Sequence, residues 1–150
     1  MKLLSLTLSV CIMFASLICS GQRSNADKGR EKTKAFNTLP ARFPAHQKSL
    51  EQLFSLTTGD SVNIEFNRNF ILNGIVTDRV HRSNDLESIN IKPSDDAGVL
   101  YTFSRIRRKD GQILFTGRAL HRNVGDVLLL TRKDGDYYFE KKQANTIIAE

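Results

Sequence analysis

The stretches 106–115, IRRKDGQILF, and 130–139, LTRKDGDYYF, share an aliphatic residue, the tetrapeptide Arg-Lys-Asp-Gly and an aromatic end. Asp-Gly between alternating segments is a strong signal of a two-residue type I′ hairpin turn, because Gly adopts positive φ freely and Asp tolerates it. Counting outward from each turn gives two matched pairs, Ile106–Phe115 and Leu130–Phe139. The sequence therefore predicts two hairpins in one register, each with an inward aliphatic–aromatic pair. A duplicated ligand loop is the alternative.

Short segments of period two, separated by turn residues, continue on both sides of these hairpins. We expect strands at 61–67, 70–81, 86–92, 99–108, 112–121, 126–132 and 136–142. No long helical pattern separates the strands, so the parallel crossovers of an α/β sheet are not expected. The prediction is a mainly β fold, an antiparallel meander of about seven strands that forms a small barrel or a sandwich.

One helix is expected before the strands. Leu50, Leu53 and Phe54 recur at helical spacing and predict a short amphipathic helix over 45–55. An extended segment bounded by Pro40 and Pro44 leads into it. The predicted organisation is a signal peptide (1–21), a basic disordered linker (22–40) and a single β-rich domain (41–150).

The chain begins MKLLSLTLSVCIMFASLICSGQ, with one lysine, an apolar run and the small residues Ser20 and Gly21. This layout is typical of a secretory signal peptide, and we expect cleavage after Ser20 or Gly21, leaving no transmembrane segment. A retained anchor and a lipoprotein modified at Cys19 are less favoured alternatives, the latter because the bulky Ile18 precedes it. Both cysteines lie in this segment, so the mature chain has none. An exported chain without disulfides indicates a bacterial periplasmic or extracellular protein.

The positive charge of the chain, +6 in total, is concentrated before the domain. Residues 22–34 carry five basic and two acidic side chains, whereas residues 35–150 carry sixteen basic and fourteen acidic ones. The domain itself is therefore nearly neutral, and we do not expect nucleic acid as its partner in the cell. The basic stretch is interpreted as a solvated linker, or alternatively as an electrostatic tether to an anionic surface.

One sheet face is the best candidate binding site. In the predicted register, alternate residues of strand 99–108 share a face with arginines of strand 112–121. The candidate ligand-binding residues are Tyr101, Phe103, Arg105, Arg107, Arg118 and Arg122. Mixed aromatic and basic side chains are typical of surfaces that bind single-stranded nucleic acid or anionic sugars. The competing interpretation places the aromatic residues in the core and the arginines at its rim.

Two similar segments, VHRSND (80–85) and LHRNVGD (120–126), each place a His-Arg pair at the end of a strand. A metal or acid–base site would require His81 and His121 to converge with a nearby Asp. Each histidine is isolated in sequence, so surface positions are favoured and we expect no metal and no cofactor. Catalytic signatures such as G-x-S-x-G or H-E-x-x-H do not occur in the sequence.

Taken together, these features predict an exported, non-enzymatic β-domain that binds a macromolecular partner, either an envelope protein or a secreted peptidase. The order of signal, basic linker, helix and β-meander resembles that of prodomains and inhibitors of secreted bacterial peptidases, a likeness of architecture that no motif carries. One alternative is a binder of an anionic polymer or glycan through the arginine-aromatic face. Another is a small hydrolase that uses His81 and His121.

Overall fold

The computed structural model describes residues 36–122 and 125–143, which belong to a compact unit spanning 32–150. The expected signal peptide and most of the expected linker lie outside these residues. The elements of the described part are β1 (Arg42–Ala45), α1 (Gln47–Leu53), β2 (Ser61–Asn67), β3 (Phe70–Ser83), β4 (Leu86–Pro93), β5 (Val99–Arg107), β6 (Ile113–His121), β7 (Asp126–Lys133) and β8 (Asp136–Gln143).

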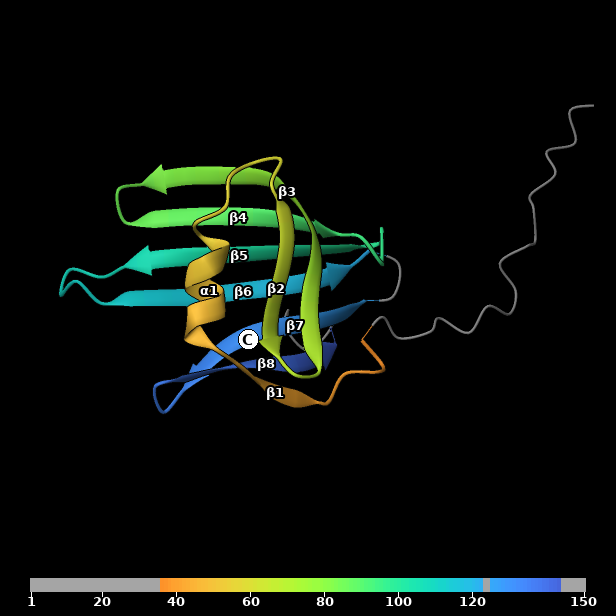
Figure 1. Ribbon diagram of the computed structural model, residues 1–150. Coiled ribbons are helices and arrows are strands. Elements are labelled where there is room, and N and C mark those ends of the chain that lie inside the picture. Colours follow the sequence, from red (N-terminus) through yellow and green to blue (C-terminus); the bar gives the residue numbers. More distant parts are fainter. Residues whose placement is uncertain (1–35, 123–124, 144–150) are drawn as a thin grey trace, which may run out of the picture. The chain divides into compact units, whose positions relative to one another are not determined.

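The eight described strands form one antiparallel sheet in the order β1-β8-β7-β6-β5-β4-β3-β2 (Figure 1). The sheet curls until its two end strands nearly meet. At this seam the His46 backbone N–H donates to the Phe66 carbonyl (3.3 Å), and the Asn67 side-chain amide donates to the Pro44 carbonyl (2.8 Å). The mainly β antiparallel prediction is confirmed, and its barrel alternative is the one observed. The structure adds one strand to the predicted ones. This strand, β1, has four residues and lies in the segment that the sequence predicts only to be extended.

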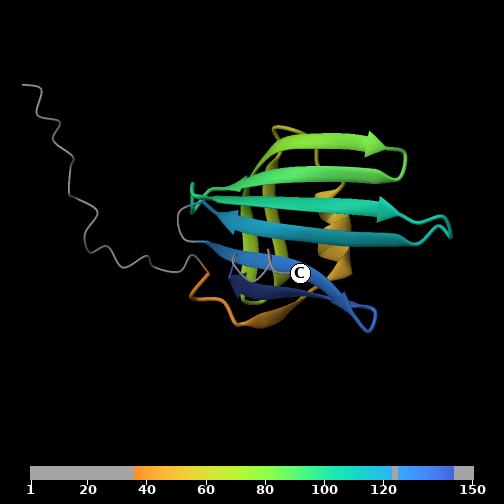
Figure 2. The same ribbon diagram turned by 180° about the vertical axis from the view of Figure 1, so that it is seen from behind.

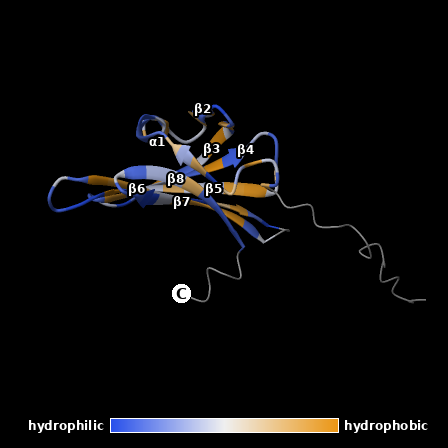
Figure 3. Ribbon diagram, turned by 90° about the horizontal axis from the view of Figure 1, so that it is seen from below, coloured by the Kyte–Doolittle hydropathy of each residue, from blue (hydrophilic) through white to orange (hydrophobic). Residues whose placement is uncertain are grey.

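The long strand β3 connects two layers. Its pairing with β4 is interrupted by a register shift between Val76 and Asp78, and such bulges bend a strand. The first half of β3 lies in front with β2 and α1, and the second half joins β4 to β8 behind (Figures 1 and 3). Figure 3 shows apolar residues along the strands and hydrophilic residues at the hairpin turns. The core therefore lies between the two layers.

Phenylalanine rings fill this core. The ring of Phe66, fully buried in β2, stacks at 5.7 Å from Phe70 and 5.9 Å from Phe103, and meets Phe139 edge-on at 5.1 Å. Such aromatic pairs stabilise a core beyond simple burial by about 0.5–1.5 kcal/mol each. The helix contributes the buried Leu50 and Leu53. It is shorter than the expected 45–55. It begins later because the chain up to Ala45 pairs as β1, and it ends at Leu53.

The β7–β8 hairpin has the predicted register. Asp134 and Gly135 both have positive φ, 54° and 94°, as a type I′ turn requires. Leu130 pairs with Phe139, and both side chains are buried in the core. The interpretation of this Arg-Lys-Asp-Gly stretch as a turn that fixes register is confirmed.

The β5–β6 hairpin does not have the predicted register. The Gly111 N–H donates to the Arg108 carbonyl (2.9 Å), the Arg108 N–H donates to the Gln112 carbonyl (2.8 Å), and Gly111 alone of the loop has positive φ, 81°. This is the three-residue loop in which a type I turn is followed by a left-handed glycine. Every pair is therefore shifted by one residue. Phe115 pairs with Arg105, and Ile106 pairs with Leu114 instead of Phe115.

Candidate functional site

The register shift separates the six candidate residues into three environments. Tyr101 and Phe103 point into the core, where burial raises the pKa of the Tyr101 phenol. Gly117, the partner of Phe103, leaves room for its ring, since a β-carbon there would lie 2.5 Å from a ring carbon. Arg118 is exposed beside Thr102 on the outer face, and Arg122 is exposed just beyond β6. The mixed aromatic and arginine face expected from the sequence is therefore not formed.

Arg105 and Arg107 remain together on the inner face. The ends of the β3–β4, β5–β6 and β7–β8 hairpins project past α1, in the front view and from behind (Figures 1 and 2). The face that forms the core elsewhere is uncovered near the first two of these hairpin ends. We call its side chains the tip shelf: His81, Glu87, Arg105, Arg107 and Ile113.

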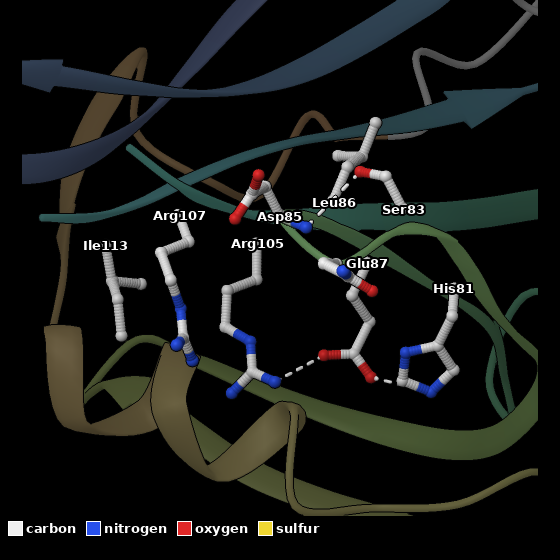
Figure 4. Close-up of a pocket in the computed structure, with 9 residues that line it drawn as sticks. His81, Ser83, Asp85, Leu86, Glu87, Arg105, Arg107 and Ile113 are labelled. Atoms are coloured by element: carbon white, nitrogen blue, oxygen red, sulfur yellow. Dashed lines mark hydrogen bonds and ion pairs between the residues drawn. The ribbon is translucent and has the colours of Figure 1, made fainter. Parts of the chain in front are cut away.

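The tip shelf consists of two cross-strand rows. In the first row, His81 of β3 pairs with Glu87 of β4, which pairs with Arg105 of β5. In the second row, nearer the turn, Arg107 of β5 pairs with Ile113 of β6. Figure 4 shows these five side chains side by side and pointing in the same direction. Strand register alone is therefore sufficient to bring them together.

Glu87 is the buried centre of the first row. Its Oε1 accepts a hydrogen bond from Arg79 Nε (2.5 Å) and lies 3.3 Å from His81 Nε2, and its Oε2 accepts one from Arg105 Nη2 (2.5 Å). Burial by itself raises the pKa of this carboxyl, but the hydrogen bond from Arg79 and the charges of Arg105, Arg79 and His81 outweigh it. The pKa of Glu87 consequently lies below its usual value. The carboxylate is ionised at neutral pH, with both oxygens already engaged.

The two arginines that hold Glu87 are themselves held by the segment after α1. Arg79 Nη1 donates to the Leu56 carbonyl (2.5 Å). The guanidinium of Arg105 lies 5.3 Å from the centre of the Phe54 ring, within the range of a cation–π contact. This network connects β3, β4 and β5 to the end of the helix. It fixes the first row and, with it, the position of Arg105.

His81 and His121 do not form a common site. His81 lies in the row of Arg105, whereas His121 pairs with Val99, six residues away along β5. Six residues of strand span roughly 20 Å, beyond the reach of a shared proton or metal ion. His121 instead lies 3.6 Å from Asp96 at the other end of the sheet. The geometry gives no support to a hydrolase built on both histidines.

The described residues contain no group of three side chains suited to holding a metal ion, and no described helix is long and apolar enough to cross a membrane. The hollow at the tip shelf has a volume of about 70 Å³. Two other hollows, beside Val127 and beside Tyr138, have volumes of about 220 and 280 Å³. All three are smaller than the roughly 300–1,000 Å³ typical of small-molecule sites.

Glu87, Arg79 and Ile113 are not among the residues that the sequence predicts for the site. One signal in the sequence points to Glu87. It is spaced by two residues from Ile89 and four from Ile91, so that all three side chains lie on the same face of the strand, and both isoleucines are fully buried. A charged residue at an inward position of an apolar strand indicates a buried ion pair. Arg79 and Ile113 carry no comparable signal, because their role depends on strands that are distant in sequence.

Comparisons with other proteins add no further constraint. No known protein family, no curated protein and no solved structure matches this chain.

Proposed function

We propose that this chain is an exported, non-enzymatic domain that binds a protein partner through the tip shelf. The observation that carries the proposal is the uncovered inner face at the hairpin ends. There an apolar side chain, Ile113, is 40% exposed beside the exposed Arg107, on the face that is packed against other residues elsewhere in the sheet. Arginine is enriched at protein interfaces, and the buried centre of an interface is more apolar than the rest of the surface.

The size of the hollows favours a macromolecule over a small substrate. A shallow surface with a hollow of about 70 Å³ cannot enclose a metabolite, but it can receive one side chain of a partner. Glu87, the buried acid of the site, is engaged by Arg79 and Arg105 and is not free to transfer protons. Both points support binding rather than catalysis.

Export rests on the amino-terminal segment, which has the layout of a secretory signal. Amino-terminal sequencing of the chain recovered outside the cytoplasm should give a start at Gly21 or Gln22. A chain that keeps Met1 and fractionates with the cytoplasm would contradict export without affecting the proposed binding surface.

Affinity capture with two matched variants tests the binding surface. Ile113→Asp places a charge on the tip shelf, whereas Leu120→Asp makes a comparable change on the same strand at a side chain that is 36% exposed on the outer face. The tagged mature chain and both variants are each incubated with an extract of the cells in which the chain naturally occurs. We expect a protein retained by the unmodified chain and by Leu120→Asp, but lost with Ile113→Asp. Equal retention by all three, or no specific protein at all, would overturn the proposal.

An anionic polymer remains the second candidate, favoured by the adjacency of Arg105 and Arg107 on one face. Retention on a heparin column at low salt separates the two candidates. A polymer site requires Arg107→Gln to elute much earlier than Arg118→Gln, since only the first removes a charge from the shelf. If a protein is the partner, both variants elute alike because each loses one positive charge.

A further inference from the structure

The guanidinium groups of Arg105 and Arg107 lie next to each other on the inner face of β5 (Figure 4). Arg105 is fixed by its hydrogen bond to Glu87 Oε2 (2.5 Å) and by its position over the Phe54 ring. Among the described residues, no hydrogen bond or ion pair engages the side chain of Arg107. One arginine is therefore pre-positioned, and its neighbour is available.

The charges around this pair do not balance. Among the residues that the structure describes, Glu87 is the one carboxylate that forms an ion pair with Arg105, and it is shared with Arg79. Asp85 also lines the hollow, but its carboxylate is directed away from the two guanidinium groups (Figure 4). The loop that follows adds Arg108 and Lys109 against a single Asp110. An excess of positive charge consequently remains at the mouth of the hollow, where two like charges would repel each other in the absence of an anion.

We infer that Arg105 and Arg107 form a carboxylate-binding subsite, which takes the side chain of an Asp or Glu from the partner. This inference rests on the proposed function and specifies the chemistry of the partner at the same surface. The planar fork of an arginine matches the two oxygens of a carboxylate. Arg105 uses one nitrogen of its fork, Nη2, for a single oxygen of Glu87, Oε2. A hollow of about 70 Å³ accommodates one such group and little more.

Ile113 defines the rest of the recognised feature. It pairs with Arg107 across the hairpin, and paired side chains have β-carbons about 4.5–5.5 Å apart. A partner side chain next to the bound carboxylate would therefore contact the exposed apolar surface of Ile113. The subsite thus selects an acidic residue beside an apolar one, in an accessible segment of the partner.

A titration followed by backbone amide NMR tests this subsite. The probe is a short peptide, amidated at its end, with one Glu next to a Leu; the control probe carries Gln in place of Glu. At low salt we expect saturable shifts at residues 105–107 and 113 with the Glu peptide and none with the Gln peptide. Arg107→Gln should weaken binding by about threefold to tenfold, the range between an exposed ion pair and a charged hydrogen bond.

Arg118→Gln is the matched control, because it removes the same charge from an exposed arginine on the outer face of the neighbouring strand. Equal weakening by the two variants would reduce the effect to net charge and overturn the subsite. Equal binding of the Gln peptide would do the same. Tighter binding of inorganic phosphate than of the Glu peptide would overturn its assignment to a carboxylate.

The outcomes for the subsite and for the proposed function are separable. If the Glu peptide does not bind while Ile113→Asp still abolishes capture of the partner, the proposed function stands and the carboxylate subsite fails. If the peptide binds while Ile113→Asp leaves capture unchanged, the anion site is real and the tip shelf is not the partner surface.

Discussion

The β5–β6 and β7–β8 hairpins carry the same Arg-Lys-Asp-Gly tetrapeptide, yet they close with different loops. The second uses Asp134 and Gly135, both with positive φ, as a two-residue turn. The first uses three residues, of which Gly111 alone has positive φ. Identical turn chemistry is therefore compatible with two registers. The residues that decide between them lie in the strands.

The numbering of the inward-facing residues, odd or even on each strand, explains why the two hairpins have loops of different length. In β7 and β8 the side chains of the core cluster have even numbers on one strand, Leu128 and Leu130, and odd numbers on the other, Tyr137 and Phe139. A loop with an even number of residues satisfies that pattern. In β5 and β6 the buried side chains are odd on both strands, Phe103 and Phe115, so the loop must have an odd number of residues. A one-residue slip would move one whole strand face from core to solvent, which costs far more than a less favoured turn.

The sharpest test of this difference compares Leu130→Ala with Ile106→Ala, at corresponding positions of the two stretches. Leu130 is buried in the core, and its truncation should lower the free energy of unfolding by about 2–5 kcal/mol. Ile106 is half-buried on the outer face, and its truncation should cost about 1 kcal/mol. Urea unfolding of both variants measures the difference. Equal losses would indicate that Ile106 is as buried as Leu130. That outcome would favour a two-residue turn in both hairpins and would contradict the observed β5–β6 register.

The odd or even numbering of inward-facing residues also explains which parts of the fold the sequence predicts. Alternation and turn residues were sufficient for the antiparallel meander and for the β7–β8 register. In 99–107 and 113–121 apolar residues recur at odd-numbered positions on both strands, which disfavours a two-residue loop. The Asp-Gly pair favours a two-residue loop, and the two signals therefore conflict in this hairpin. The sequence does not predict strand β1, because four residues that include a proline carry a weak strand signal.

The candidate site was only partly predictable, for a different reason. The sequence predicts Arg105 and Arg107 as neighbours because they recur on one face of one strand. Glu87 and Ile113 join them through pairings with two other strands, and a one-residue error in either pairing replaces the neighbours. The register error had that effect: it placed Arg118 beside Phe103, where the structure has Gly117. A site assembled across strands is therefore no more predictable than the least certain register within it.

The second test concerns the charged row of His81, Glu87 and Arg105. The β5–β6 hairpin contributes Arg105 to this row from its inner face, whereas the inner face of the β7–β8 hairpin has the buried Tyr137. Glu87→Gln leaves Arg79 and Arg105 without their charged partner, and removing one member of a buried ion pair typically costs 3–5 kcal/mol. Because both arginines are partly exposed, we expect the free energy of unfolding to fall by a smaller amount, about 2–3 kcal/mol.

The matched control is Glu140→Gln on β8, whose contact with Arg42 (3.3 Å) is more exposed. That variant should lose at most about 1 kcal/mol. Similar losses in the two variants would contradict the central role of Glu87.

The pH dependence of stability follows from the same carboxylate. The pKa of Glu87 is lower in the folded protein than in the unfolded chain, so the unfolded state binds the proton more readily. The stabilisation from Glu87 is therefore fully present above the unfolded-state pKa, and it is lost as the pH falls through the folded-state pKa. Urea unfolding of the unmodified chain and of Glu87→Gln, from neutral pH into the acid range, should show the gap between them narrowing. A gap that widens toward acid would reverse the inferred direction of the shift.

The smallest expected effect lies in the turns themselves. Asp134→Ala places an alanine at a φ of 54°, and the left-handed region costs an ordinary residue about 1–2 kcal/mol. Because aspartate already bears part of that cost, the expected net loss is about 1 kcal/mol. Asp110 lacks positive φ, and its replacement by alanine removes only the exposed hydrogen bond from the Gln112 N–H to Asp110 Oδ1 (2.9 Å). That loss should be about 0.5 kcal/mol. Thermal or urea unfolding resolves the pair, and a larger loss at Asp110 would mean that its loop, too, closes as a two-residue turn.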